Sequence, residues 1–181
     1  MKMLKKLLAV VLTGAMALTL LTACGGNAVT EKDLADALTD MAKAEGKNIT
    51  LTPRAEEREL ARKIAALHEG KTTDQENGDE IKEILECKEG GANANNFVWW
   101  GEARADKIGT SGQAYQLAHQ ALKEEDAENY HNLQNEKPVD DRYMGTALCK
   151  MIDEDGKTVT VRVIVVTAPV KGQEPQRPGK A

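Results

Sequence analysis

Two side chains of this chain, a carboxylate and an imidazole, are of types that do chemistry together. Glu102 lies at the end of a short apolar run that is typical of a strand, and His131 follows the next predicted helix. If the two face each other across a cleft, they can share a proton or hold a cation. One residue of each kind is fewer than the three or four protein ligands of a zinc site, so we expect no metal and no other cofactor. The alternative is that Glu102 ends an edge strand in solvent and His131 caps a loop.

The other histidines and cysteines have structural interpretations. His68 lies beside a predicted helix end at Gly70, where a charged imidazole stabilises the negative end of the helix dipole. His119 lies among polar residues of a later helix, which favours an exposed face. Cys87 and Cys149 could form a disulfide that closes a loop of about 60 residues, or both could stay reduced and buried. Since no nucleophile motif or phosphate-binding loop is present, the sequence favours a protein that is not an enzyme.

The first residues have the pattern of a secretory signal peptide. Three lysines within residues 2–6 precede an apolar run over residues 7–21. This run is shorter than the about 20 residues that a membrane-spanning helix needs. The tetrapeptide Leu21-Thr22-Ala23-Cys24 resembles the lipobox of bacterial lipoproteins, which implies removal of residues 1–23 and a diacylglyceryl group on the Cys24 sulfur. We therefore expect a protein anchored by lipid to the extracytoplasmic face of the cell membrane, with an ordinary signal peptide as the alternative.

The composition indicates one acidic domain after the signal peptide. The mature chain, residues 24–181, is long enough to bury a real core. The formal net charge of the whole chain is −5, and aromatic residues make up 3%. Because binding to phosphates needs clustered positive charge, we expect no nucleic-acid partner.

Hydrophobic periodicity and capping signals predict the order of secondary structure. The predicted helices cover about 30–45, 53–69, 80–88 and 111–126, and the predicted strands cover 97–103, 143–152 and 157–167. The second helix has Thr52 as its cap and Pro53 at its first position. Around these elements we predict a tether over 24–29, an extended linker over 48–53 and a disordered tail over 169–181. Helices covering a small antiparallel sheet define a layered α+β domain across residues 30–168.

Four segments are similar, in order, to motifs of the CAP superfamily, which includes cysteine-rich secretory, antigen-five and pathogenesis-related proteins. Residues 34–66 resemble the family's opening helix, its "L-x-L-x-P" segment and its alanine-rich helix. Residues 101–103 match the first two positions of "GEN", residues 129–133 resemble "GHxxN", and residues 145–147 resemble the "GvG" strand. The resemblance implies an α-β-α sandwich with a cavity of two histidines and two acidic residues. This chain departs from it, because residues 71–94 contain no histidine and Ala103 replaces the asparagine of "GEN".

The family has binding, interaction and disputed hydrolytic members, so the resemblance implies no single activity. We expect a non-enzymatic module that binds a small apolar or cell-envelope ligand, or a protein partner, beside Glu102 and His131. One of the adjacent Trp99 and Trp100 would contribute to this groove, since neighbouring strand residues point to opposite faces. The alternatives are an envelope-directed hydrolase that uses Glu102 and His131, and a purely structural surface lipoprotein.

Overall fold

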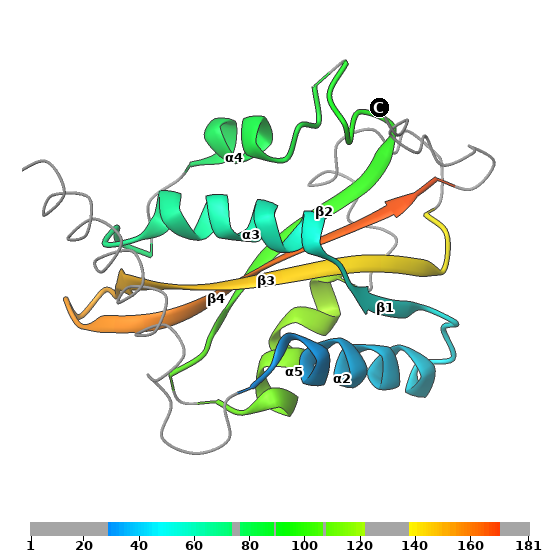
Figure 1. The fold of residues 1–181 in the computed structure, drawn as a ribbon. Coiled ribbons are helices and arrows are strands. Elements are labelled where there is room, and N and C mark those ends of the chain that lie inside the picture. Colours follow the sequence, from blue (N-terminus) through cyan, green and yellow to red (C-terminus); the bar gives the residue numbers. More distant parts are fainter. Residues whose placement is uncertain (1–28, 74–76, 89, 107, 122–137, 171–181) are drawn as a thin grey trace, which may run out of the picture.

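The structure, a computed structural model, describes residues 29–73, 77–88, 90–106, 108–121 and 138–170 (Figure 1). Its helices and strands, in chain order, are α2 (Glu31–Ala44), β1 (Thr50–Pro53), α3 (Ala55–His68), α4 (Gly78–Ile84), β2 (Asn96–Arg104), α5 (Thr110–Ala121), β3 (Asp141–Ile152) and β4 (Thr158–Pro169). The predicted signal peptide, Cys24, His131 and the tail after Val170 lie outside the described residues. Val170 forms a β-bridge with Pro138, so the first two residues of the predicted tail belong to the domain.

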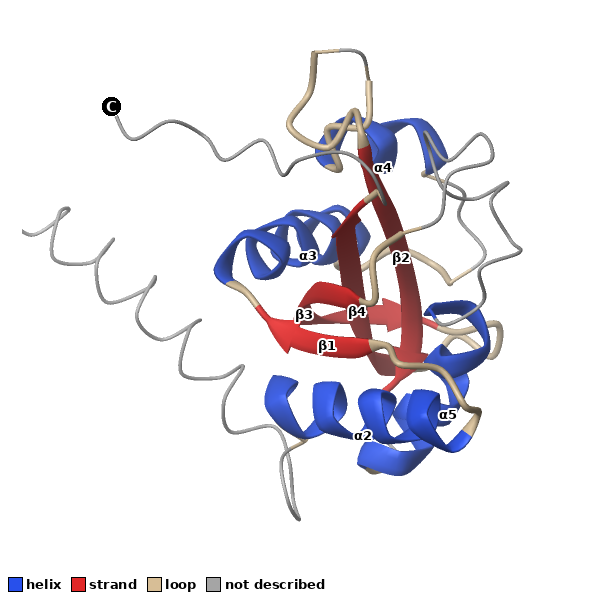
Figure 2. Cartoon of the chain, turned by 90° about the vertical axis from the view of Figure 1, so that its right-hand side faces the viewer, coloured by secondary structure: helices blue, strands red, loops and turns tan. Residues whose placement is uncertain are grey.

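The strands form one mixed sheet in the order β1-β3-β4-β2. β3 and β4, over the last two predicted strands, form an antiparallel hairpin, and β2 pairs antiparallel with β4. β1 pairs parallel with β3. Helices α3 and α4 lie on one face of this sheet, and α2 and α5 lie on the other (Figures 1 and 2). The predicted α+β class is confirmed, whereas the expectation of a wholly antiparallel sheet is wrong at β1.

Strand β1 occupies the segment that we predicted to be a linker. Among its four residues only Leu51 is buried, as in a half-covered strand. Strand β1 forms hydrogen bonds with main-chain groups at the outer edge of β3. The N–H of the next residue, Arg54, donates to the carbonyl of Met144 at 2.8 Å. Pro53 therefore ends β1 instead of beginning a helix, and Arg54 replaces Thr52 as the N-cap of α3.

Each face of the sheet has its own hydrophobic core. The core between the sheet and helices α2 and α5 includes the large side chains of Leu34, Leu38, Phe97, Trp99, Leu117, Met144 and Ile164. The core between the sheet and helices α3 and α4 includes Leu60, Ile64, Ile81, Val98, Val161, Val163 and Val165. Each such side chain contributes about 1.5–3 kcal/mol when it is fully buried, so both helix layers are stabilised on the sheet.

The sheet and α3 approach each other most closely at Gly145 of β3. A Cβ atom at this position would lie 1.9 Å from the main-chain nitrogen of Arg58 and 2.2 Å from the carbonyl carbon of Glu57. These separations are far shorter than any non-bonded contact, so only glycine allows α3 to lie this close to β3.

The other end of α3 is fixed to the edge of β3 by main-chain contacts. The Lys150 N–H donates to the Glu69 carboxylate at 2.9 Å, and the Gly70 N–H donates to the Lys150 carbonyl at 2.8 Å. Two more hydrogen bonds link Ile152 to Lys71 and Thr73. The last turn of α3, which carries His68, is therefore held at a defined place over the sheet.

Candidate functional site

The structure brings Glu102 into contact with a histidine that the sequence analysis assigned to a helix cap. Glu102 Oε1 lies 2.5 Å from Nδ1 of His68, the last residue of α3. His131 lies outside the described residues, so the predicted pairing of Glu102 with His131 stays a prediction. Glu102 is therefore part of a carboxylate–imidazole pair, and the partner that the structure describes is His68.

Strand alternation sets the direction of the Glu102 side chain. On β2, residues 98, 100, 102 and 104 share one face of the sheet, and Val98 and Trp100 pack in the core below α3 and α4. Glu102 pairs with Val163 of β4, which lies in the same core. The carboxylate therefore leaves the sheet toward the end of α3, where His68 lies.

Helical spacing explains why His68 points to the sheet. Leu60 and Ile64 are buried on the same stripe of α3, at intervals of four residues before His68. His68, the last residue of this stripe, is also buried, with 4% of its surface exposed. This spacing is a sequence signal that predicts burial, in addition to the position near the helix end at Gly70 that favoured a capping role.

The two members of the pair differ in exposure. The Glu102 side chain is 27% exposed, while the imidazole below it is buried. Trp100 contacts the imidazole edge to face, with ring centroids 5.9 Å apart and planes at 71°. Trp99 lies in the opposite core, which confirms the prediction that the two indoles point to different faces. The site thus consists of a reachable carboxylate, a covered imidazole and a half-buried indole.

The contact between His68 and Glu102 is short but poorly aligned. The distance of 2.5 Å is shorter than the about 2.7–2.9 Å of a charge-assisted N–H···O hydrogen bond. However, neither ring nitrogen of His68 nor Glu102 Oε1 has a partner in hydrogen-bond geometry among the described residues. A buried polar atom without a partner costs about 1–3 kcal/mol, so this is not a site selected for stability alone.

The thiols of Cys87 and Cys149, in the core between the sheet and helices α3 and α4, are unreactive. Burial raises the pKa of the Cys87 thiol to about 11. Burial, with the negative charges of Glu102 and Glu69, raises the pKa of the Cys149 thiol to about 12. Both cysteines are buried in the same core and are not bonded to each other, so the disulfide that the sequence left open is absent in this structure. Because the thiolate is the reactive form, neither cysteine is a nucleophile at neutral pH.

A second polar cluster, at the beginning of α3, differs because its hydrogen bonds are complete. Glu57 is 1% exposed and accepts hydrogen bonds from Arg54 Nε at 2.6 Å and from the Thr167 hydroxyl at 2.5 Å. The Arg54 guanidinium also lies 3.9 Å from the centre of the Tyr143 ring. The hydrogen bond with Glu57 raises the pKa of Arg54, so the guanidinium stays ionised. These contacts describe a structural cluster.

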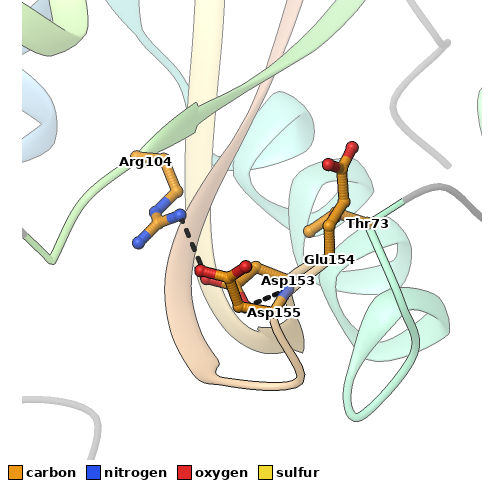
Figure 3. Close-up of a pocket in the computed structure, with 5 residues that line it drawn as sticks. All are labelled: Thr73, Arg104, Asp153, Glu154 and Asp155. Carbon is orange, nitrogen blue, oxygen red and sulfur yellow. Dashed lines mark hydrogen bonds and ion pairs between the residues drawn. The ribbon is translucent and has the colours of Figure 1, made fainter.

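A hollow of about 320 Å³ lies at the β3–β4 turn (Figure 3). It is lined by Thr73, Arg104, Asp153, Glu154 and Asp155. The Asp153 carboxylate accepts the N–H groups of Asp155 and Lys157 at 3.1 and 2.9 Å, and it lies 3.7 Å from Arg104. These contacts order the turn, and we assign the hollow no chemistry.

Neither a metal centre nor a membrane span is present in the part of the chain that the structure describes. Among those residues, no three His, Cys, Asp or Glu side chains are grouped as a metal site requires. No helix there combines the length and apolar character needed to cross a bilayer. Comparison with known proteins found no matching family model, no matching curated protein and no matching solved structure.

Proposed function

We propose that this protein is a lipid-anchored extracytoplasmic binding module of CAP-like architecture, held to the membrane by a diacylglyceryl group on Cys24. Its ligand site is formed by Glu102, His68 and Trp100. The observation that carries this proposal is the contact of a partly exposed carboxylate with a buried imidazole, beside a half-buried indole. The order of the helices and strands and the position of Glu102 on β2 are consistent with the resemblance to the CAP superfamily.

The chemistry around the pair favours binding over catalysis. Neither nitrogen of His68 is hydrogen-bonded to a hydroxyl among the described residues, so no activated serine or threonine is formed there. The raised pKa of Cys149 removes the neighbouring thiol as a nucleophile. A carboxylate and an indole can still select a ligand that has an apolar face and hydrogen-bond donors, such as a cell-envelope fragment.

A ligand titration followed by tryptophan fluorescence tests this proposal. Peptidoglycan fragments and phospholipids are added to the purified protein, and we expect a ligand that contacts Trp100 to change its emission. The Glu102→Gln variant should weaken this response about tenfold, since a hydrogen bond to a charged group contributes about 1.5–3 kcal/mol. Glu154→Gln, at the exposed β3–β4 turn, is the control and should bind as the parent does.

The failure of every ligand to change the emission would favour the structural lipoprotein instead. The anchor is tested separately by detergent-phase partition of the protein made in a bacterium. We expect it in the detergent phase with lipid on Cys24, and we expect Cys24→Ala to abolish the modification. Recovery of the unmodified chain in the aqueous phase would contradict the anchor and leave the ligand site standing.

An envelope-directed hydrolase is a second candidate, because a carboxylate within 2.5 Å of an imidazole is the arrangement that orients a general base. Incubation of envelope fragments with the protein, followed by mass spectrometry, distinguishes it from binding. Cleavage that is lost in both Glu102→Gln and His68→Gln, at unchanged Tm, would favour the hydrolase that this contact suggests. Binding without cleavage would favour the module.

A further inference from the structure

We infer that the exposed side of α5 faces the lipid bilayer, so that the Glu102 site opens away from it. This inference rests on the lipid anchor proposed at Cys24. The first residue that the structure describes, Val29, is hydrogen-bonded to Arg162. Arg162 of β4, which is 6% exposed, donates from Nη2 to the Val29 carbonyl at 2.8 Å and from Nε to Gln113 Oε1 at 2.7 Å. Gln113 belongs to α5, so the chain enters the domain beside this helix.

The chain outside the structure is too short to place the domain freely. Val29 is the fifth residue after Cys24. Even a fully extended chain of five residues spans only about 17 Å. The layer of α2 and α5, into which Val29 leads, therefore lies next to the bilayer. The layer of α3 and α4 lies on the other face of the sheet (Figure 2) and is about 20 Å farther away, since each packed layer adds about 10 Å.

Within this layer, α5 is the helix whose surface suits a bilayer. Its twelve residues contain no Asp, Glu, Lys or Arg, although charged residues make up 29% of the chain. Its exposed side chains include Ser111, Gln116 and Tyr115, which is 65% exposed. Tyrosine is a residue that membrane–water interfaces favour, because its ring is apolar and its hydroxyl stays hydrated.

The neighbouring helix α2 has the opposite character. Its exposed charged residues are Lys32, Asp33, Asp36, Asp40 and Lys43. Charged side chains keep their hydration only in water, so placing α2 against the headgroups would cost more than placing α5 there. The two helices share a face of the sheet, and the difference in charge selects α5.

The register of the sheet determines where the ligand site then points. Arg162 pairs with Ala103, and the next residue along β4, Val163, pairs with Glu102. Neighbouring strand residues point to opposite faces, so Glu102 and Arg162 leave the sheet on opposite sides. With α5 on the bilayer, the Glu102 site faces the aqueous envelope. A ligand in the wall or in solution can then reach it, while a lipid within the same bilayer cannot.

Site-specific quenching in vesicles tests this orientation. Two variants of the full chain, Gln116→Cys on α5 and Lys63→Cys on the exposed surface of α3, are produced in a bacterium and labelled with the same thiol-reactive NBD dye. Lipid blocks Cys24 and burial protects Cys87 and Cys149. Each protein is reconstituted into vesicles of phosphatidylethanolamine and phosphatidylglycerol, with and without a headgroup spin-labelled lipid. We expect the quencher to reduce the emission at position 116 and to leave position 63 unchanged.

The remaining outcomes each contradict the inference in a recognisable way. Equal or greater quenching at position 63 would overturn it, while detergent partition of the same sample shows that the anchor stands. Quenching at neither position would also overturn it. A blue shift at position 116 that disappears when the protein-to-lipid ratio is lowered would identify a second copy as the partner of α5. Partition of both proteins into the aqueous phase would remove the proposed anchor and the inference together.

Discussion

Buried polar side chains at the two ends of α3 differ in how their atoms are satisfied. Glu57 accepts hydrogen bonds from Arg54 and Thr167 and is closed to solvent. His68 lies against Glu102 without an aligned hydrogen bond among the described residues, and its carboxylate partner is partly exposed. A satisfied buried group stabilises the fold, whereas an incompletely satisfied one beside the surface is available to a ligand. The first cluster should therefore affect stability and the second binding.

Replacing Glu57 should destabilise the domain. In Glu57→Gln the charge that pairs with Arg54 is lost, and the Thr167 hydroxyl loses a charged acceptor. We expect the free energy of unfolding to fall by about 2 kcal/mol, as for other buried hydrogen bonds to charged groups. Urea unfolding followed by circular dichroism measures the change. Glu59→Gln, at an exposed position of α3 outside this cluster, is the control, and an equal loss in both variants would contradict the role of Glu57.

The two buried thiols should make the domain less stable at high pH. Each folded-state pKa, about 11 for Cys87 and about 12 for Cys149, is above the ordinary value of 9.0. The folded protein therefore holds more protons than the unfolded chain once the pH exceeds about 9, and stability falls as the pH rises toward 12. A Cys149→Ser variant should have a smaller slope of unfolding free energy against pH in this range. A slope equal to that of the parent would show that other groups cause the loss.

Residue spacing predicts which side chains of the Glu102 site are buried and which share a face, whereas the contact between them requires the structure. The interval from Leu60 and Ile64 to His68 predicts a buried imidazole, and alternation along β2 predicts that Glu102 and Trp100 share a face. The contact between His68 and Glu102 could not be predicted in this way. It depends on where the end of α3 lies over the sheet, which is set by residues far away in the sequence.

At the level of elements, the position of α3 is determined at both of its ends. Its beginning lies directly on Gly145, and the residues after it are hydrogen-bonded to Lys150 and Ile152 of the same strand. A helix fixed at two points cannot tilt without breaking contacts at one of them. The geometry of the Glu102 site therefore depends on a glycine near the opposite end of the helix.

Substitution of Gly145 by alanine tests this dependence. The added methyl group would overlap the main chain at Arg58 and Glu57, so α3 must move away from β3. We expect a loss of about 3 kcal/mol in unfolding free energy, as in severe overpacking. A change in Trp100 fluorescence should accompany it, since the indole contacts His68. Gly109→Ala is the control, because a Cβ there meets nothing within 4 Å, and similar losses in both variants would contradict the steric argument.

The elements that the sequence analysis located best are those with local signals. Helix α2 follows its N-cap Thr30, at the start of the helix predicted over 30–45, and β3 and β4 lie within about two residues of the strands predicted over 143–152 and 157–167. Strand β1 was missed because four residues around a proline have little strand propensity of their own. This segment is a strand because it pairs with β3, and pairing with a distant segment gives no signal in the local sequence.

At the level of the whole molecule, the sheet separates two surfaces for which we propose different roles. Val29, α2 and α5 lie on one side, where Arg162 connects three parts of the fold. The Glu102 site lies on the other side, below the end of α3. Composition and periodicity are sufficient to predict the α+β class. They do not determine which helices share a face, because that follows from the strand order and the parallel connection of β1.

Removal of the Arg162 guanidinium should loosen the side of the domain that holds the N-terminal segment. In Arg162→Leu the Val29 carbonyl, Gln113 Oε1 and the Thr146 hydroxyl each lose a charged hydrogen-bond donor. We expect a loss of about 3 kcal/mol, since groups left unsatisfied on burial cost about 1–3 kcal/mol each and part of that cost is relieved by relaxation. Hydrogen exchange should become faster in α5 and in the first turn of α2, while α3 keeps its protection.

The exposed Arg62→Leu change on α3 provides the comparison, because Arg62 contacts only the side chain of Glu59 at 3.5 Å among the contacts described for it. It should leave both unfolding and exchange as in the parent. If Arg162→Leu instead accelerated exchange equally in α3 and α5, the arginine would stabilise the fold as a whole. If only the α5 side responds, the N-terminal attachment and the Glu102 site are held by separate contacts on opposite faces of one sheet, which is the arrangement that an anchored binding module requires.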